Sequence, residues 1–172
     1  MSTKTLIAAA GMLVAAGAAN AQFSGPYAPA NWTFSANGGD GSFTNDGSTL
    51  NLVGNNNGTG SINTDYTINA AAAGNFAFNW QYNVGDTGTW DTGFYLVNGV
   101  QTFLATNNSG VLAGVVSVPV NMGESIGFRM FSADGALGAS SLTITNFSGP
   151  VPAPASLALL GLGGLVAGRR RR

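Results

Sequence analysis

Few side chains in this 172-residue chain could carry chemistry, because it has no cysteine, no histidine and only seven acidic residues. These absences exclude disulfides, thiolate nucleophiles and imidazole bases or metal ligands. The most promising pair is Asp86 and Asp91, which share one stretch rich in glycine and threonine. Two such carboxylates could flank a glycosidic bond, bind Ca²⁺ together with backbone carbonyls, or cap tight turns, as Asp does in glycine-rich loops.

Turn capping is the simplest of these interpretations, and it also applies to Asp40 and Asp46. Asp134 is a further weak candidate ligand for Ca²⁺ from a later part of the chain. No stretch has the spacing of an EF-hand loop, so we predict no cofactor beyond this weak Ca²⁺ alternative. Because no paired nucleophile and base is evident, we expect a protein without enzymatic activity and predict no catalytic residue.

Arg129 is the only basic residue between Lys4 and Arg169. On a strand it would face away from its neighbours Phe128 and Met130, because side chains alternate between the two faces. We expect it to form an ion pair with an acidic residue, the candidates being Asp86, Asp91 and Asp134.

Trp80 and Trp90 are expected to have different roles. Trp90 precedes Asp91 in a predicted loop, where an exposed indole can stack on a sugar ring, so it is the candidate ligand contact. Trp80 belongs to an alternating aromatic stretch and is predicted to lie in the core.

Hydrophobic alternation predicts an all-β fold. The four aromatic residues from Phe76 to Tyr82 fall on every second position, which places them on one face of a strand. Clusters of Gly, Asn and Asp separate similar stretches, and Asn98-Gly99 between two β-prone runs predicts a tight hairpin. No helix of ordinary length is evident between residues 22 and 150. We therefore predict an antiparallel β-sandwich, jelly-roll-like in its connections.

Residues 1–21 have the pattern of a secretory signal peptide with a helical apolar centre. Lys4 supplies the basic start, residues 6–16 are apolar, and Ala19 and Ala21 are small where signal peptidase requires small residues. Cleavage is expected between Ala21 and Gln22, because the apolar run is too short for a membrane span.

Residues 151–172 differ from everything before them. Val151-Pro152-Ala153-Pro154 precedes an almost wholly apolar run, which is predicted to form a hydrophobic transmembrane helix, and the chain closes with Arg169, Arg170, Arg171 and Arg172. Arginine clusters favour the cytoplasmic side, so the body of the chain is expected outside the membrane. One interpretation of this pattern is a permanent C-terminal anchor.

The segment between these ends, residues 22–150, has a more negative net charge than the whole chain. The full chain has a formal charge of −1, but this segment sets Arg129 alone against all seven acidic residues, a formal charge of −6. It therefore lacks the positive surface that nucleic acid requires. Neutral polysaccharide, cations or further copies of the chain are the expected partners.

The C-terminal pattern resembles the PEP-CTERM sorting signal of bacterial surface and exported proteins, in which a proline motif, an apolar stretch and an arginine cluster end the chain. Pro152-Ala153-Pro154 matches the motif, with Ala153 where family members carry Glu. The resemblance implies that an exosortase, a membrane protease-transpeptidase, recognises the tail and cuts near the prolines. It also implies a destination at the cell surface or in an exopolysaccharide matrix.

Together these features predict an exported, non-enzymatic protein that is processed by signal peptidase and exosortase. Its sandwich would be a structural or adhesive module of the cell surface or extracellular matrix, with polysaccharide as a partner. The alternatives are a carbohydrate-active enzyme and a calcium-dependent carbohydrate-binding module, both of which would use Asp86 and Asp91.

Overall fold

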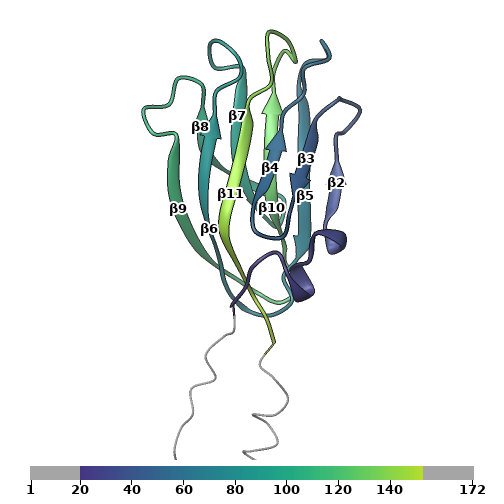
Figure 1. Ribbon diagram of the computed structural model, residues 1–172, viewed down its shortest axis with the longest axis vertical. Coiled ribbons are helices and arrows are strands. Elements are labelled where there is room, and N and C mark those ends of the chain that lie inside the picture. The colour runs from purple at the N-terminus through teal and green to yellow at the C-terminus, as the bar shows by residue number, and fades with distance from the viewer. Residues whose placement is uncertain (1–19, 153–172) are drawn as a thin grey trace, which may run out of the picture. The chain divides into compact units, whose positions relative to one another are not determined.

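The computed structural model describes residues 20–152, which form an antiparallel sandwich of two β-sheets (Figure 1). The predicted fold class is confirmed. The helices predicted within the leader and the tail lie outside the described residues. Among residues 20–152 there is no helix long and apolar enough to cross a membrane.

The first sheet has the strand order β3 (Ser42–Asn45), β4 (Leu50–Val53), β11 (Ser141–Pro150), β6 (Gly74–Asn83) and β9 (Ala113–Val120), with β1 (Asn20–Ala21) paired to the end of β11. The second sheet has the order β2 (Thr33–Ser35), β5 (Ile62–Asn69), β10 (Ser125–Ser132), β7 (Asp91–Val97) and β8 (Val100–Thr106). Two short 3₁₀ turns, η1 (Gly25–Tyr27) and η2 (Pro29–Asn31), precede β2. Strand β4 lies beside β11 and β5 beside β10, which is the interleaved order of a double-sheet jelly roll.

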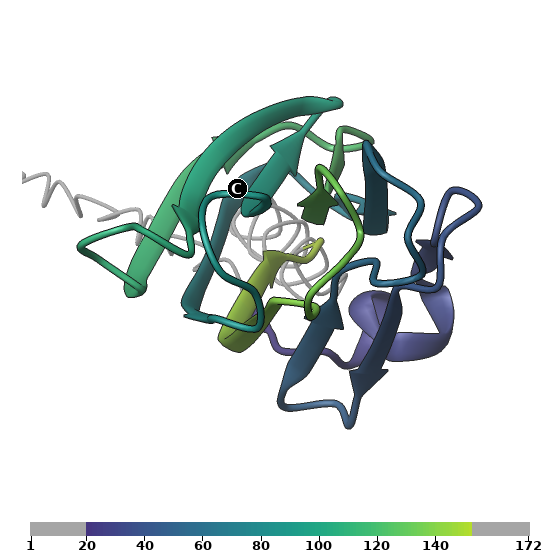
Figure 2. The same cartoon turned by 90° about the horizontal axis from the view of Figure 1, so that it is seen from above.

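The aromatic face of β6 supplies the centre of the core. Phe76, Phe78, Trp80 and Tyr82 are buried, whereas Ala77, Asn79 and Gln81 between them are more exposed, as the alternation predicts. The ring of Phe78 meets that of Phe128 on the opposite sheet edge to face, with centroids 4.9 Å apart. Seen from above, the strands surround this interior (Figure 2). Contacts between rings of opposite sheets therefore hold the two layers together.

The predicted hairpin is also confirmed. Strand β7 ends at Val97 and β8 begins at Val100, with Asn98 and Gly99 both at positive φ between them. A two-residue turn with positive φ at both positions suits the twist of the flanking strands, which explains why the Asn-Gly pair is informative.

A β-bulge in β11 breaks the alternation that the sequence predicts. Thr145 pairs with Asn79 and Ser148 with Ala77, so β11 has one residue more than β6 at this point. Asn146 takes the extra position at a φ of 49°. The bulge turns Phe147 into the core, where its ring stacks on that of Phe23 at a centroid distance of 4.6 Å.

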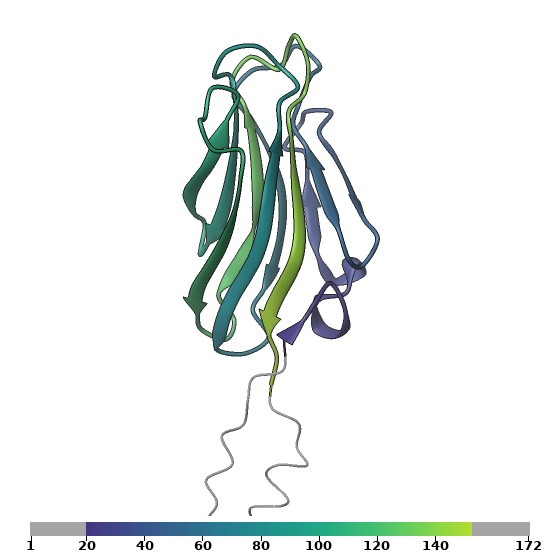
Figure 3. The same ribbon diagram turned by 60° about the vertical axis from the view of Figure 1, so that its left-hand side comes forward.

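The two ends of the described chain leave the sandwich at the same end (Figures 1 and 3). Asn20 and Ala21, which the sequence assigns to the leader, pair as β1 with Pro150 and Gly149 of β11. We call this the tail end; it also contains the turns at residues 70–73 and 121–124. The opposite end, which we call the loop end, contains the loops at residues 84–90, 107–112 and 133–140.

The hydroxyl of Tyr27 ties η1 to this tail end. It donates a hydrogen bond to the carbonyl oxygen of Pro150 at 2.7 Å and accepts one from the amide of Ala71 at 2.9 Å. Tyr27 is fully buried, and burial raises the pKa of its phenol. Both backbone groups therefore depend on one buried hydroxyl.

The variant Tyr27→Phe should lower the free energy of unfolding by about 1–3 kcal/mol, because two backbone groups lose their partner without a replacement. Urea unfolding of the full chain measures this loss. The control is Tyr95→Phe on β7, a partly buried tyrosine whose hydroxyl makes no hydrogen bond within residues 20–152. Equal losses in the two variants would contradict the role of the Tyr27 hydroxyl.

Candidate functional site

The loop end brings together the acidic pair that the sequence singles out. Asp86 lies between β6 and β7 and is 5% exposed, and Asp91 is the first residue of β7 and is 1% exposed. The carboxylate of Asp91 accepts a hydrogen bond from the Ser140 amide at 2.8 Å. The Asn107 side chain donates to the Asp86 carbonyl at 2.8 Å and accepts from the hydroxyls of Tyr82 and Ser140. Four segments thus meet in one buried polar cluster.

One carboxylate oxygen in this cluster has no partner. Asp86 Oδ1 accepts a hydrogen bond from the amide of Thr87, the next residue in the chain. Asp86 Oδ2 is buried and has no hydrogen-bond partner. The bond to Thr87 therefore satisfies only one of the two oxygens of this carboxylate.

The pKa of the Tyr82 phenol depends in part on the same two acids. Its ring lies in the core, and its hydroxyl also contacts the Asp91 carbonyl oxygen at 3.0 Å. Burial raises the pKa of the phenol well above its ordinary value, and the negative charges of Asp91 and Asp86 raise it further. The phenol is therefore a neutral hydrogen-bonding group at ordinary pH.

Asp134 lies in another loop of the loop end, and Arg129 lies within β10. Asp134 caps its own loop by accepting from the Ala136 amide at 3.3 Å. The expected partners of Arg129 were wrong, because the guanidinium binds Asp65 through two bonds of 2.7 and 2.8 Å. The pairing register places Arg129 on β10 directly opposite Asp65 on β5. The hydrogen bonds that the guanidinium donates to Asp65 raise the pKa of Arg129.

Trp90 is 51% exposed at the loop end, as expected for a ligand contact. Three aliphatic side chains of the same end are also exposed, namely Val84, Val111 and Leu137. Trp80, by contrast, is 8% exposed and covers Gly114 on the neighbouring strand, so its assignment to the core is confirmed. The loop end thus has one exposed indole, that of Trp90, which precedes the buried Asp91 in the chain.

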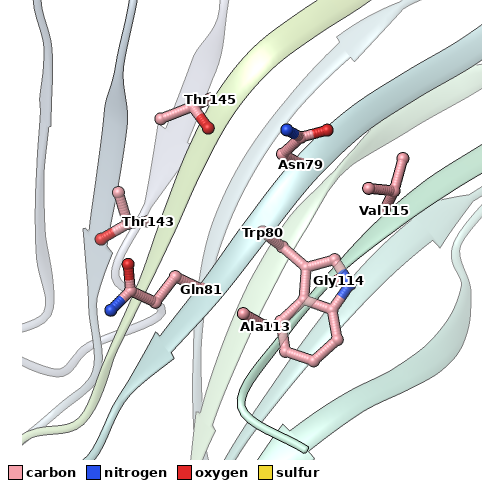
Figure 4. A pocket seen from close by; sticks show the side chains of 8 residues that line it. All are labelled: Asn79, Trp80, Gln81, Ala113, Gly114, Val115, Thr143 and Thr145. Carbon is pink, nitrogen blue, oxygen red and sulfur yellow. The ribbon is translucent and has the colours of Figure 1, made fainter.

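The outer face of the first sheet is a further candidate surface that the sequence analysis did not predict. None of the strands of the first sheet contains a charged residue, and their outer face has a shallow hollow of about 400 Å³. Figure 4 shows the hollow, which is lined by Asn79, Gln81, Thr143, Thr145, Ala113, Gly114, Val115 and the edge of Trp80. The signal was present in Asn79 and Gln81, which lie between aromatic positions of β6 and carry uncharged amides rather than charged side chains.

Residues 150–172 match the family described as the PEP-CTERM protein-sorting motif. The tail of this chain is a PEP-CTERM sorting signal. This confirms the resemblance, and the match begins at Pro150, the last residue of β11. A PEP-CTERM motif implies processing by an exosortase and marks exported proteins that are sorted at the cell surface.

The start of the PEP-CTERM segment is the only part of it that the structure describes. Val151 is half-buried and packs against the core, whereas Pro152 is exposed. Ala153, Pro154 and the four terminal arginines lie outside the described residues, as does Ala19 of the predicted signal-peptidase site. Gln22 is exposed at the tail end. The segment therefore begins where the sandwich ends.

Among solved structures, this chain is similar to family 35 carbohydrate binding modules. One from an environmental isolate is 23% identical, with a TM-score of 0.36, over 70% of this chain and 93% of that one. Those from Clostridium thermocellum and Paenibacillus barcinonensis are each 17% identical, with TM-scores of 0.32 and 0.34. They cover 66% and 69% of this chain and 87% and 94% of their own. No curated protein matches the chain.

The raised pKa of Tyr82 predicts a loss of stability in alkali. The folded state holds the phenolic proton more tightly than the unfolded chain, so the contribution is complete below the unfolded pKa of about 10 and declines as pH rises above it. The urea midpoint should therefore fall above pH 10. Above pH 10, the urea midpoint should fall less steeply with pH in Tyr82→Phe than in Tyr95→Phe. Equal slopes in the two variants would contradict the raised pKa of Tyr82.

Proposed function

We propose that this protein is a non-enzymatic adhesive module of the cell surface or extracellular matrix, and that neutral polysaccharide is its partner. One observation carries the proposal: the exposed indole of Trp90 lies at the loop end, opposite the tail end where the sorting signal begins. Attachment through residues beyond Pro152 leaves the loop end free to meet other molecules.

The chemistry of the loop end favours a neutral sugar polymer. An indole stacks on the apolar face of a sugar ring, and Val84, Val111 and Leu137 add exposed aliphatic surface at the same end of the sandwich. The predicted body has a formal charge of −6, and its one base, Arg129, is already paired with Asp65. Anionic polymers are therefore repelled at long range, whereas neutral ones are not.

The environment of Asp86 and Asp91 supports a role other than catalysis. A glycosidase needs one carboxyl group to reach the glycosidic oxygen and a second to reach the sugar carbon or a water. Both carboxylates here are at least 95% buried, and that of Asp91 is bonded to a backbone amide. Their burial favours a structural function within the loop end.

Delivery would follow from the two termini. Signal peptidase would remove residues 1–21, the apolar part of residues 151–172 would hold the chain in the membrane, and the exosortase would cut near Pro152-Ala153-Pro154. Because the sandwich is complete at Pro150, neither cut removes a core strand. Removal of β1 would take away its two-residue pairing with β11, which is not a core strand pairing.

Intact-mass measurement of the exported protein tests this delivery. We expect a mass that lacks residues 1–21 and the four terminal arginines. A matched variant without Arg169–Arg172 should escape exosortase processing and keep its tail. A wild-type mass that still includes the arginines would leave a permanent anchor as the correct interpretation.

Binding to neutral polysaccharide purified from the producing cells tests the adhesive function. Trp90→Ala should weaken binding about tenfold, which corresponds to about 1.4 kcal/mol. The control is Phe103→Ala, which removes a similarly exposed aromatic ring from β8 on the side of the sandwich. Equal losses in both variants, or no binding by the wild type, would contradict the proposal.

A further inference from the structure

We propose that β9, an edge strand of the first sheet, pairs with β9 of a second copy of this chain. The two strands run antiparallel and are centred on Val115, so that the first sheets of both copies join into one continuous sheet. This contact goes beyond the polysaccharide binding proposed for the loop end and does not depend on it.

Strand β9 has backbone groups that its neighbour β6 does not use. Within residues 20–152, β6 is the only strand paired with β9. The Tyr82 amide of β6 donates a hydrogen bond to the carbonyl oxygen of Leu112, the residue before β9, at 2.7 Å. In an antiparallel ladder, residue pairs that exchange hydrogen bonds alternate with pairs that do not. The N–H and C=O groups of Ala113, Val115 and Ser117 therefore point away from β6.

Pro119 agrees with this orientation and limits the free edge. It is the next outward-pointing position after Ser117, and it lies opposite Asn75 of β6 in the pairing register. Proline has no amide hydrogen and is tolerated on an edge strand where the N–H would face solvent. The free edge of β9 thus has three outward N–H groups, which end at Pro119.

The two lateral sides of the sandwich differ in how open they are to strand pairing. Phe34 of β2 contacts Phe43 of β3, and Phe78 of β6 contacts Tyr95 of β7. The edge strands β2 and β3 therefore share one side, and β8 and β9 share the other (Figure 1). Strands β2 and β3 have three and four residues, whereas β8 and β9 have seven and eight. Because short strands protect an edge from pairing, the side with β8 and β9 is the more open one.

This open side has no charged residue on its strands. Natural edge strands commonly carry lysine or another charge that prevents pairing, but neither β8 nor β9 contains one. All seven acidic residues lie outside these two strands, so the pairing of β9 with β9 places no carboxylate opposite another. Val115, at the middle of the free edge, is 74% exposed. An exposed, long and uncharged edge of this kind is suited to pairing with another strand.

A second copy fits this edge because β9 is complementary to itself. A twofold axis at Val115 places Ala113 of one copy opposite Ser117 of the other, and Val115 opposite Val115. In each of these pairs an outward N–H meets an outward C=O, so both chains donate and accept hydrogen bonds in the same register. The same patch is then used by both copies, as in twofold dimers generally.

The direction of β9 determines which copies can pair. The strand begins after the loop at residues 107–112 of the loop end and finishes before the turn at residues 121–124 of the tail end. Antiparallel pairing therefore turns the tail ends of the two copies in opposite directions. If the chain is attached through its tail, as proposed above, the contact joins copies carried by two facing surfaces.

Disulfide cross-linking of the full chain tests the contact, in detergent with a large excess of micelles over chains. The chain has no cysteine, so Val115→Cys introduces a single thiol. Residues directly opposite in a hydrogen-bonded antiparallel pair have Cα atoms about 5.5 Å apart, within the range of a disulfide. Mild oxidation should therefore link Val115→Cys into dimers, and more of them at 0.15 M than at 0.01 M salt, because salt screens the repulsion between negative bodies. Ser42→Cys, exposed on the opposite edge strand β3, is the control and should give only background cross-linking.

A mixture of two variants tests the direction of pairing. Ala113→Cys and Ser117→Cys should form a mixed dimer with each other, whereas neither should link efficiently to itself. The mixed dimer should also form between phosphatidylcholine vesicles that carry the two variants separately. Cross-linking of Val115→Cys no higher than that of Ser42→Cys would overturn the proposal, as would self-linking of Ala113→Cys in excess of the mixed dimer.

Discussion

The pairing of β11 with β4 on one side and β6 on the other is the interaction on which the rest of the structure depends. The last strand lies in the middle of the first sheet, so this sheet is complete only when the end of the domain is in place. The bulge at Asn146 turns Phe147 into the cluster formed with Phe23 and Trp32, which links the first aromatic residues of the body to the last. The sorting signal therefore follows directly on the strand that completes the fold.

This placement divides the molecule into two ends with different chemistry. At the tail end, the Tyr27 hydroxyl and β1 bind the end of β11, and processing is proposed to occur just beyond it. At the loop end, the side chain of Asn107 connects Tyr82, Asp86 and Ser140, which come from three different segments. The core between them consists mainly of aromatic and aliphatic contacts, so each end can differ in chemistry without altering the packing between the sheets.

Features of the fold that depend on neighbouring residues were predicted from the sequence. Features that depend on the pairing of distant strands were not. Alternation over β6 and the Asn98-Gly99 turn depend on neighbouring residues, and both were predicted from the sequence. The ion pair of Arg129 with Asp65 depends on the register of two strands distant in sequence, and the inward turn of Phe147 on a bulge. The sequence likewise paired Asp86 with Asp91, but their burial results from segments around Asn107 and Ser140 that only the fold brings near.

The central claim is that the protein is attached through the tail end and binds polysaccharide at the opposite loop end. Site-specific labelling tests this claim directly. The chain has no cysteine, so Leu137→Cys at the loop end and Met122→Cys at the tail end each introduce a single, exposed thiol. On intact cells, a membrane-impermeant maleimide should label both variants. Added matrix polysaccharide should protect the thiol at position 137 and leave that at position 122 reactive. Protection at position 122 alone, or equal protection at both, would contradict the account.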